Sequence, residues 1–303
     1  MSGERSVTVA AVQAAPVFLD LDATVERTCE LVAEAAGLGA RLIVFPEAFL
    51  PGYPDWVWRL PAWDDGTWYK RLYEQAVEIP GPATKRLGQA ARDTNTWLAV
   101  GVDEKGSSGT VYCTLLYIDP SGNVAGVHRK LMPTGGERTV WGQGDGSTLT
   151  VVDTDFGRVG GLICWENYMP LARQAMYQQG VDIYVAPTWD SAETWVATIR
   201  HIAKEGRVFV VSVNMCMRGS DVPESLPGME DIYHGADDWL SHGRSMIAGP
   251  EGEILAGPLV DEPGILTATI DLGDLALARR AFDPVGHYSR PDVFRFTVTT
   301  QGG

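Results

Sequence analysis

The side chain best suited to covalent chemistry in this 303-residue chain is a thiol at the end of a predicted strand. Cys164 follows the apolar run 158–163, in which Gly160 and Gly161 permit close approach of a neighbouring backbone. Helix-forming residues begin near Pro170, so we expect a sharp turn from strand to helix. Such a turn would project the thiol into a cleft, where helix N–H groups would favour the thiolate. The thiol is therefore a candidate nucleophile, although a free cysteine is also common as a small buried hydrophobe.

A carboxylate and an amine end two other predicted strands. Glu47 follows the apolar run 41–45 and precedes a turn-rich segment, while Lys130 ends the loosely alternating run 124–130. A carboxylate can accept a proton from a thiol, and an ammonium can stabilise negative charge on a substrate. Each residue alone has an ordinary alternative, because Glu47 could cap the next turn and Lys130 could be a solvated charge. Their similar placement at strand ends strengthens the case for a catalytic thiol.

The elements that position these residues alternate between strands and helices, and their order occurs twice. In the first half we predict strands at 7–12, 41–45, 97–102, 112–118 and 124–128, and helices at 21–36 and 83–94. In the second half we predict strands at 158–163, 182–187, 208–213, 244–248, 253–256 and 264–270, and helices at 170–179 and 192–206. Short, nearly continuous apolar strands indicate sheets covered on both faces, and turn-joined pairs add antiparallel strands. The pattern predicts an α/β fold with pseudo-two-fold internal symmetry, and a doubly wound single sheet is the alternative.

The chain resembles the nitrilase branch of the carbon–nitrogen hydrolases, whose members use a glutamate, a lysine and a cysteine in that chain order. The matching segments lie at 45–49, 51–54, 128–134, 137–138, 144–147, 164–167 and 286–292, so the resemblance covers nearly the whole chain. The Cys-Trp-Glu-Asn tetrad at 164–167 is typical of nitrilases rather than of amidase or carbamoylase relatives. The resemblance implies a four-layer αββα sandwich of two mixed sheets. It also implies that Glu47, Lys130 and Cys164 are the catalytic residues.

The same resemblance implies which residues position the substrate. Glu137 is similar to a second carboxylate of the family that orients substrate and water, and we add Trp165, Tyr53 and Trp189 as substrate-positioning residues. Pairing of Glu137 with the adjacent Arg138 remains an alternative.

Neighbouring residues of the two motifs have more ordinary interpretations. Glu166 could simply occupy the first helical turn, where its charge suits the helix dipole, and His128 is interpreted either as a residue that supports the catalytic groups from behind or as a sheet residue. Four tryptophans cluster after Glu47, and they indicate either ordinary packing or an aromatic pocket: Trp56, Trp58, Trp63 and Trp68.

Hydrolysis of an organic nitrile to the carboxylic acid and ammonia is the predicted reaction, through a thioimidate and then a thioester on Cys164. Glu47 can act as base and acid in turn if shielding raises its pKa. An amidase, an N-carbamoyl hydrolase or a cyanide dihydratase is the alternative. A non-catalytic binding homologue is the third hypothesis, and the intact triad disfavours it.

Two departures from the family pattern affect specificity and assembly. Arg244 stands where many nitrilases have glycine, and we expect it to narrow or polarise the rim of the pocket. The chain ends soon after the matching segment 286–292, which favours a dimer over long spirals. We expect a homodimer or higher homo-oligomer that packs through outer helices, including the helix that follows Cys164.

Composition limits the partners. The net charge of −15 would repel nucleic acid and anionic lipid, so neither is expected as a partner. No apolar run is long enough for a membrane span, the first residues are too polar for a signal peptide, and we expect a cytoplasmic protein. The four cysteines and five histidines lack metal-ligand spacing, so we expect reduced thiols, no metal and no cofactor. We predict one domain over residues 1–303, because no linker or low-complexity tract interrupts the chain.

Overall fold

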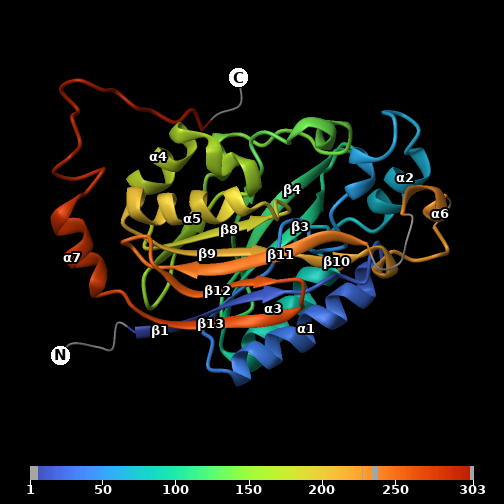
Figure 1. Ribbon diagram of the computed structural model, residues 1–303, viewed down its shortest axis with the longest axis horizontal. Helices are drawn as coiled ribbons and strands as arrows, with labels where there is room; N and C mark the ends of the chain where they lie inside the picture. Colours follow the sequence, from blue (N-terminus) through green and yellow to red (C-terminus); the bar gives the residue numbers. More distant parts are fainter. Residues whose placement is uncertain (1–5, 227, 234–237, 301–303) are drawn as a thin grey trace.

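Two β-sheets pack face to face between two layers of helices in the computed structural model, which describes residues 6–226, 228–233 and 238–300 (Figure 1). One of the five histidines, His234, lies outside these ranges. The strands are β1 Ser6–Gln13, β2 Leu42–Val44, β3 Trp97–Lys105, β4 Val111–Ile118, β5 Val124–Arg129, β6 Val151–Asp153, β7 Arg158–Gly161, β8 Ile183–Thr188, β9 Phe209–Asn214, β10 Cys216–Arg218, β11 Trp239–Ala248, β12 Ile254–Val260 and β13 Gly264–Asp271. The α-helices are α1 Leu21–Gly37, α2 Gly66–Glu74, α3 Pro82–Thr94, α4 Pro170–Gln178, α5 Glu193–Gly206, α6 Met229–Ile232 and α7 Asp274–Ala281, and short 3-10 turns join several of them.

The two sheets repeat one pairing scheme, which confirms the predicted pseudo-two-fold symmetry. In the first sheet the order is β13-β1-β2-β3-β4-β5, with β1, β2 and β3 parallel and the outer pairs antiparallel. The second sheet has the same succession of parallel and antiparallel pairs in the order β6-β7-β8-β9-β11-β12. Its additional strand, β10, pairs with β11. The single doubly wound sheet considered as an alternative is wrong.

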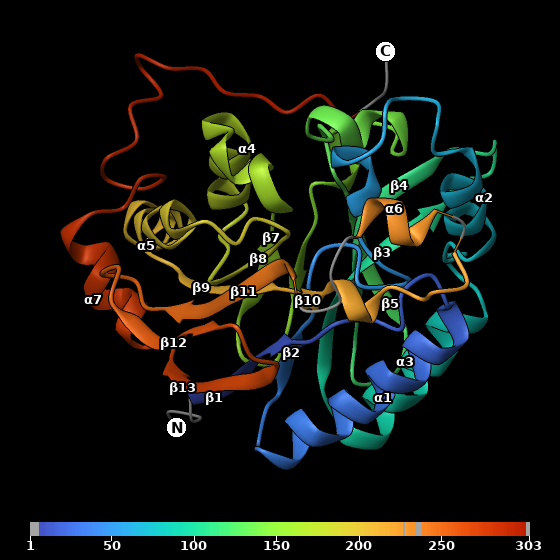
Figure 2. The ribbon, with the colours of Figure 1, turned by 45° about the vertical axis from the view of Figure 1, so that its right-hand side comes forward.

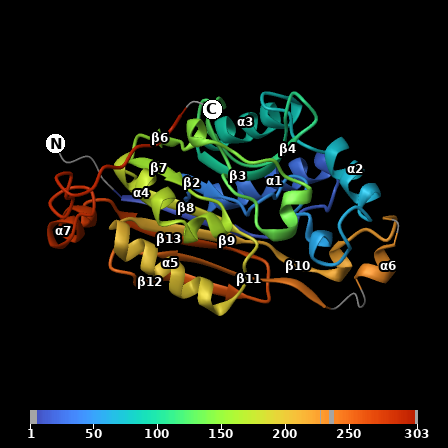
Figure 3. The same ribbon diagram turned by 90° about the horizontal axis from the view of Figure 1, so that it is seen from above.

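The helices cover the outer faces of the sheets. Helices α1 and α3 pack against each other and against the first sheet, whereas α4 and α5 cover the second (Figures 2 and 3). Helix α1 begins where the Asp20 side chain accepts a hydrogen bond from the Ala23 N–H, and its buried side chains recur at helical spacing at Val25, Val32 and Ala35. Between the sheets, β1 contacts β9 and β11. The parallel strands at the centre of each sheet are therefore covered by helices on one face and by the other sheet on the opposite face. The αββα sandwich is therefore confirmed.

Several boundaries differ from the sequence-based prediction. The strand before the nucleophile candidate ends at Gly161 rather than at residue 163, and the 3-10 turn Cys164–Tyr168 follows it; helix α4 begins at Pro170, as predicted. The short elements α2, α6, α7, β6 and β10 were not predicted, since they are too brief to show a clear period. No described helix combines the length and apolar character that crossing a bilayer requires.

Candidate active site

Cys164 lies on a sharp turn that its neighbours shape. Gly161, at the end of β7, runs so close to β8 that a Cβ atom would lie 1.8 Å from the Val185 carbonyl oxygen. Cys164 itself has a φ of 51°, a left-handed conformation that costs a non-glycine residue about 1–3 kcal/mol. Asn167 Nδ2 holds the turn by donating to the carbonyl oxygens of Leu162 at 2.9 Å and Cys164 at 2.8 Å. The predicted sharp turn and the close backbone approach at Gly161 are both present.

Glu47 lies on a comparable turn after β2 in the other sheet. Ala48 has a φ of 47°, and the turn passes directly over Gly101 of β3, where a Cβ atom would lie 2.1 Å from the Pro46 carbonyl oxygen. The Glu47 side chain is fully buried. Lys130 immediately follows β5, so the structure brings the ends of three strands together, as the sequence predicts.

One lysine joins two buried carboxylates at the centre of the site. Lys130 Nζ donates to Glu47 Oε1 at 2.6 Å and to Glu137 Oε2 at 2.7 Å. Glu137 therefore pairs with Lys130 rather than with its neighbour Arg138. Glu47 Oε2 accepts no hydrogen bond from the described residues, and thus this oxygen is available to accept a proton.

Burial sets the electrostatics of these groups. It raises the pKa of Glu47 to about 7, with Lys130 opposing the shift and Glu137 adding to it. Burial lowers the pKa of Lys130, but Glu47 and Glu137 outweigh it and hold that pKa well above its usual value. A charged lysine beside a carboxylate that can gain or lose a proton near neutrality is the arrangement that acid–base catalysis requires.

The predicted lowering of the thiol pKa is wrong. Burial, followed by the nearby Glu47 carboxylate, raises the pKa of Cys164 well above its usual value, and Lys130 only partly offsets them. The helix N-terminus that was expected to favour the thiolate begins six residues later, at Pro170. Cys164 is therefore a thiol at rest and needs a base to become a nucleophile.

Aromatic side chains hold the Glu137 oxygen that does not contact Lys130. Tyr53 Oη donates to Glu137 Oε1 at 2.7 Å and accepts from Trp58 Nε1 at 3.0 Å. The Tyr53 ring also stacks on Trp189, with ring centroids 4.4 Å apart and planes 8° from parallel. The backbone N–H of Thr134 donates to Glu137 Oε2 at 2.6 Å. These contacts orient Glu137 toward Lys130.

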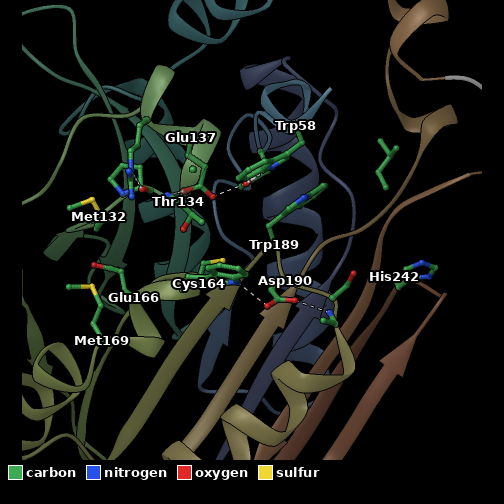
Figure 4. Close-up of a pocket in the computed structure, with 18 residues that line it drawn as sticks. Trp58, Met132, Thr134, Glu137, Cys164, Glu166, Met169, Trp189, Asp190 and His242 are labelled. Atoms are coloured by element: carbon green, nitrogen blue, oxygen red, sulfur yellow. Dashed lines mark hydrogen bonds between the residues drawn. The ribbon is translucent and has the colours of Figure 1, made fainter. Parts of the chain in front are cut away.

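A cavity of about 1010 Å³ opens above Cys164. Figure 4 shows Cys164, Glu137, Trp58 and Trp189 around it. Its apolar lining comes from Tyr53, Trp58, Trp165, Trp189, Met132, Met169 and Leu240, and its polar lining includes Arg138, Asp190 and His242. The predicted positioning residues Glu137, Tyr53, Trp165 and Trp189 all line this cavity.

Two expectations concern the rim of the cavity. Leu240 and His242 of β11 line the cavity, whereas Arg244 of the same strand is not among its described lining residues, so narrowing or polarisation of the rim by Arg244 stays a prediction. Among the clustered tryptophans, Trp58 lines the cavity, whereas Trp56 and Trp68 are buried in the core and Trp63 is exposed.

Sequence reasoning missed three contacts to the reactive groups. Thr188 Oγ1 donates to Cys164 Sγ at 3.2 Å, Cys113 Sγ donates to Glu47 Oε1 at 3.7 Å, and Lys130 Nζ lies 5.3 Å from the centroid of the Trp141 ring. Only Thr188 had a sequence signal. It follows Ala186-Pro187 in β8 as Glu47 follows Phe45-Pro46, at the equivalent place in the second half.

Comparison with known proteins assigns the family. The carbon–nitrogen hydrolase family model matches residues 8–280, so the chain belongs to the carbon–nitrogen hydrolases. An aliphatic nitrilase of Sinorhizobium fredii is 47% identical over 95% of this chain and 94% of its own length. Nitrilase 2 of Arabidopsis thaliana is 44% identical over 95% and 87%, and a bifunctional nitrilase/nitrile hydratase of Nicotiana tabacum is 42% identical over 98% and 87%.

Solved structures agree on the fold. A carbon–nitrogen hydrolase from Helicobacter pylori superposes with a TM-score of 0.74 at 22% identity, covering 96% of this chain and 97% of its own. An amidase from Nesterenkonia of the nitrilase superfamily gives a TM-score of 0.68 at 22% identity, covering 93% and 96%. The chain is thus a hydrolase of carbon–nitrogen bonds other than peptide bonds, and the predicted family and fold are confirmed.

Proposed function

We propose that this hydrolase acts as a nitrilase, with Cys164 as nucleophile, Glu47 as proton carrier and Lys130 as the group that stabilises developing negative charge. The observation that supports these roles most strongly is the buried contact of Lys130 with both Glu47 and Glu137, directly beside the Cys164 thiol. The similarity to named nitrilases over almost the whole chain supports the same reaction.

The first step is activation of the thiol. Because the pKa of Cys164 is raised, the thiol gives up its proton only as it attacks, and Glu47 Oε2 accepts it. Lys130 and the Cys113 thiol hold the other oxygen, Oε1, and therefore set the direction in which Oε2 points. Thr188 donates a hydrogen bond to the sulfur and would stabilise the negative charge that develops on it.

Attack on the nitrile carbon forms a carbon–sulfur bond and converts the triple bond to a C=N bond. Lys130 stabilises the negative charge on nitrogen, and Glu47 returns the proton to that nitrogen, which gives a neutral thioimidate on Cys164. Water then adds to the carbon with Glu47 as base, and the tetrahedral carbon expels ammonia and leaves a thioester. A second water cleaves the carbon–sulfur bond, which releases the carboxylic acid and restores the thiol.

Glu137 is proposed to orient the substrate and the water rather than to exchange protons. It lines the cavity, and its two oxygens already accept hydrogen bonds from Lys130, Tyr53 and the Thr134 backbone. Glu137 raises the pKa of Lys130, so the ammonium keeps a second carboxyl partner when Glu47 gains a proton.

The cavity favours a nitrile with an uncharged, ring-bearing substituent. A volume of about 1010 Å³ is at the upper end for small-molecule sites and exceeds what a short aliphatic nitrile would fill. Trp58, Trp165 and Trp189 offer ring faces on which an aromatic group can stack. We propose aromatic or arylaliphatic nitriles as the preferred class.

A substrate panel tests this function. Aliphatic, aromatic and arylaliphatic nitriles and the matching amides would be assayed for ammonia, with the acid and amide products separated. The proposal predicts ammonia and carboxylic acid from nitriles, with the highest kcat/KM for ring-bearing ones. Ammonia from amides or carbamoyl compounds alone would assign the chain to the alternative activity, and a preference for short aliphatic nitriles would refute the ring-bearing class.

We also propose that the protein forms a homo-oligomer through the surface that begins at the 3-10 turn of the nucleophile. Trp165, Tyr168, Met169 and Leu171 are all exposed there, and Leu171 is 69% exposed. Contiguous exposed apolar side chains of this kind mark association surfaces.

A further inference from the structure

Glu166, two residues after the nucleophile, makes contacts that tie both halves of the active site together. Its Oε1 accepts the backbone N–H of Leu131 at 2.6 Å, and its Oε2 accepts the backbone N–H of Ile163 at 2.8 Å. Leu131 follows Lys130 and Ile163 precedes Cys164, so one carboxylate binds the chain next to both reactive residues. The Glu166 side chain is fully buried.

His128 supplies the third hydrogen bond to this carboxylate. Its Nε2 lies 2.9 Å from Glu166 Oε2 and its Nδ1 lies 3.0 Å from the carbonyl oxygen of Thr148. The ring therefore lies between two hydrogen-bond acceptors, one on each side. His128 lies in β5, two residues before Lys130, and its side chain is also fully buried.

The three contacts span the two sheets. Lys130 is anchored by β5 of the first sheet, whereas Cys164 is anchored by β7 of the second, and no strand pairing joins these two strands. The relative position of the ammonium and the thiol therefore depends on contacts between the sheets. Glu166 belongs to the turn of Cys164, so its hydrogen bond from Ile163 is local, whereas its contacts with the Leu131 N–H and the His128 ring cross that junction.

We propose that Glu166, supported by His128, is a positioning residue that fixes the distance between the Lys130 ammonium and the Cys164 thiol. This inference rests on the proposed nitrilase function. It replaces the sequence-based interpretation of Glu166 as a charge that suits a helix dipole, and it favours, of the two interpretations of His128, the one in which this residue supports the catalytic groups.

Replacing the carboxylate by an amide gives a sharp test. In Glu166→Gln one of the two terminal atoms becomes an NH₂ group, which cannot accept, so at least one of the backbone hydrogen bonds from Leu131 and Ile163 is lost. A misplacement of about 1 Å lowers turnover by about 100-fold, so we expect kcat to fall by about that factor. Glu166 also lines the cavity, but both of its oxygens are already engaged by Leu131, Ile163 and His128, so we expect KM to change less than kcat.

The measurement is kcat per intact site, with the sites counted by iodoacetamide alkylation of Cys164 and peptide mass spectrometry. A second pair of variants keeps the test decisive if Glu166→Gln does not fold. His128→Gln retains a donor that can reach Glu166 and should keep more of the per-site kcat than His128→Ala, which removes it. His201→Gln is the matched control, because His201 Nε2 makes a contact of the same length, 2.9 Å, with Glu205 on the exposed surface of α5.

The outcomes separate the inference from the function on which it rests. Per-site kcat lowered in Glu166→Gln, with His128→Gln above His128→Ala and His201→Gln unchanged, supports the positioning role. Variants that lose thermal stability but keep the wild-type kcat per alkylatable site would overturn the positioning role. Glu166 and His128 would then contribute to stability alone. A wild-type protein without nitrile hydrolysis would instead refute the proposed function.

Discussion

Two buried carboxylates that share one lysine govern the protonation of the site. Glu47 gains and loses a proton near neutrality, because burial raises its pKa to about 7. Glu137 is held by Tyr53 and Thr134 and maintains the charge on Lys130. Since burial raises the pKa of the Cys164 thiol, the proposed mechanism requires the unprotonated form of Glu47 as base.

This dependence fixes the acid side of the pH profile. Below the pKa of Glu47 its carboxyl group is mostly protonated and cannot act as a base. The fraction of the unprotonated form falls about tenfold for each pH unit below that pKa. We expect kcat/KM to rise with pH and to level off near an apparent pKa of about 7. A profile that stays flat down to about pH 5, near the ordinary carboxyl pKa, would contradict the role of a buried Glu47 as base.

Separate substitutions should divide proton transfer from charge stabilisation. Glu47→Gln removes the base and Lys130→Ala removes the stabilising charge, and each should lower kcat by several orders of magnitude. Both variants should fold, which circular dichroism would verify. Arg138→Gln is the comparison, because Arg138 lines the cavity but contacts neither carboxylate, and it should affect KM more than kcat. Near-native turnover in Lys130→Ala would remove the lysine from the mechanism.

Among the secondary-structure elements, the ends of the apolar strands are what allowed the site residues to be predicted from the sequence. Glu47, Lys130 and Cys164 each follow an apolar run, and the parallel strands deliver two of them to equivalent edges of the two sheets. Thr188 was recoverable from the repeated order of elements. The contacts of Cys113 and Glu166 were not, because they depend on register and on packing between sheets, which no local period encodes.

The thiol pKa was mispredicted for a related reason. The strand and the later helix were both expected, but residues 162–169, which include the 3-10 turn Cys164–Tyr168, separate them. Burial in the sandwich, which a local sequence pattern does not reveal, then outweighs the contribution of Lys130.

Glycines in the strands make room for the catalytic turns. In Gly101→Ala the added Cβ would collide with the backbone of the Glu47 turn, so we expect a loss of about 3 kcal/mol or more in the free energy of unfolding and about 100-fold in kcat. Denaturant unfolding and steady-state kinetics measure the two effects. Gly37→Ala at the exposed end of α1 is the control, because its Cβ would meet no atom within 4 Å. Full activity in Gly101→Ala would show that the Glu47 turn does not require this contact.

At the scale of the whole molecule, the proposed association surface lies beside the nucleophile. Arg173 in α4 donates to the Asn167 carbonyl oxygen at 2.6 Å, and Asn167 in turn holds the Cys164 turn. Packing of a second copy on α4 would therefore stabilise the geometry of the active site as well as cover apolar side chains.

Leu171→Asp tests this link. A charge at this position should split the assembly and lower activity with it, as measured by light scattering across concentration paired with kinetics. Leu277→Asp on α7 is the matched control, since Leu277 is also 69% exposed, and it should leave the assembly intact. A wild-type protein that is a fully active monomer at all concentrations would refute the proposal.

The central claim is that Cys164 forms a covalent bond with the nitrile carbon. Intact-mass and peptide mass spectrometry of the enzyme with a slowly hydrolysed arylaliphatic nitrile measures this directly. We expect one adduct per chain, equal in mass to the thioimidate or thioester and located on Cys164, and neither adduct nor turnover in Cys164→Ala. An adduct on Cys113 instead, or near-native turnover in Cys164→Ala, would contradict it.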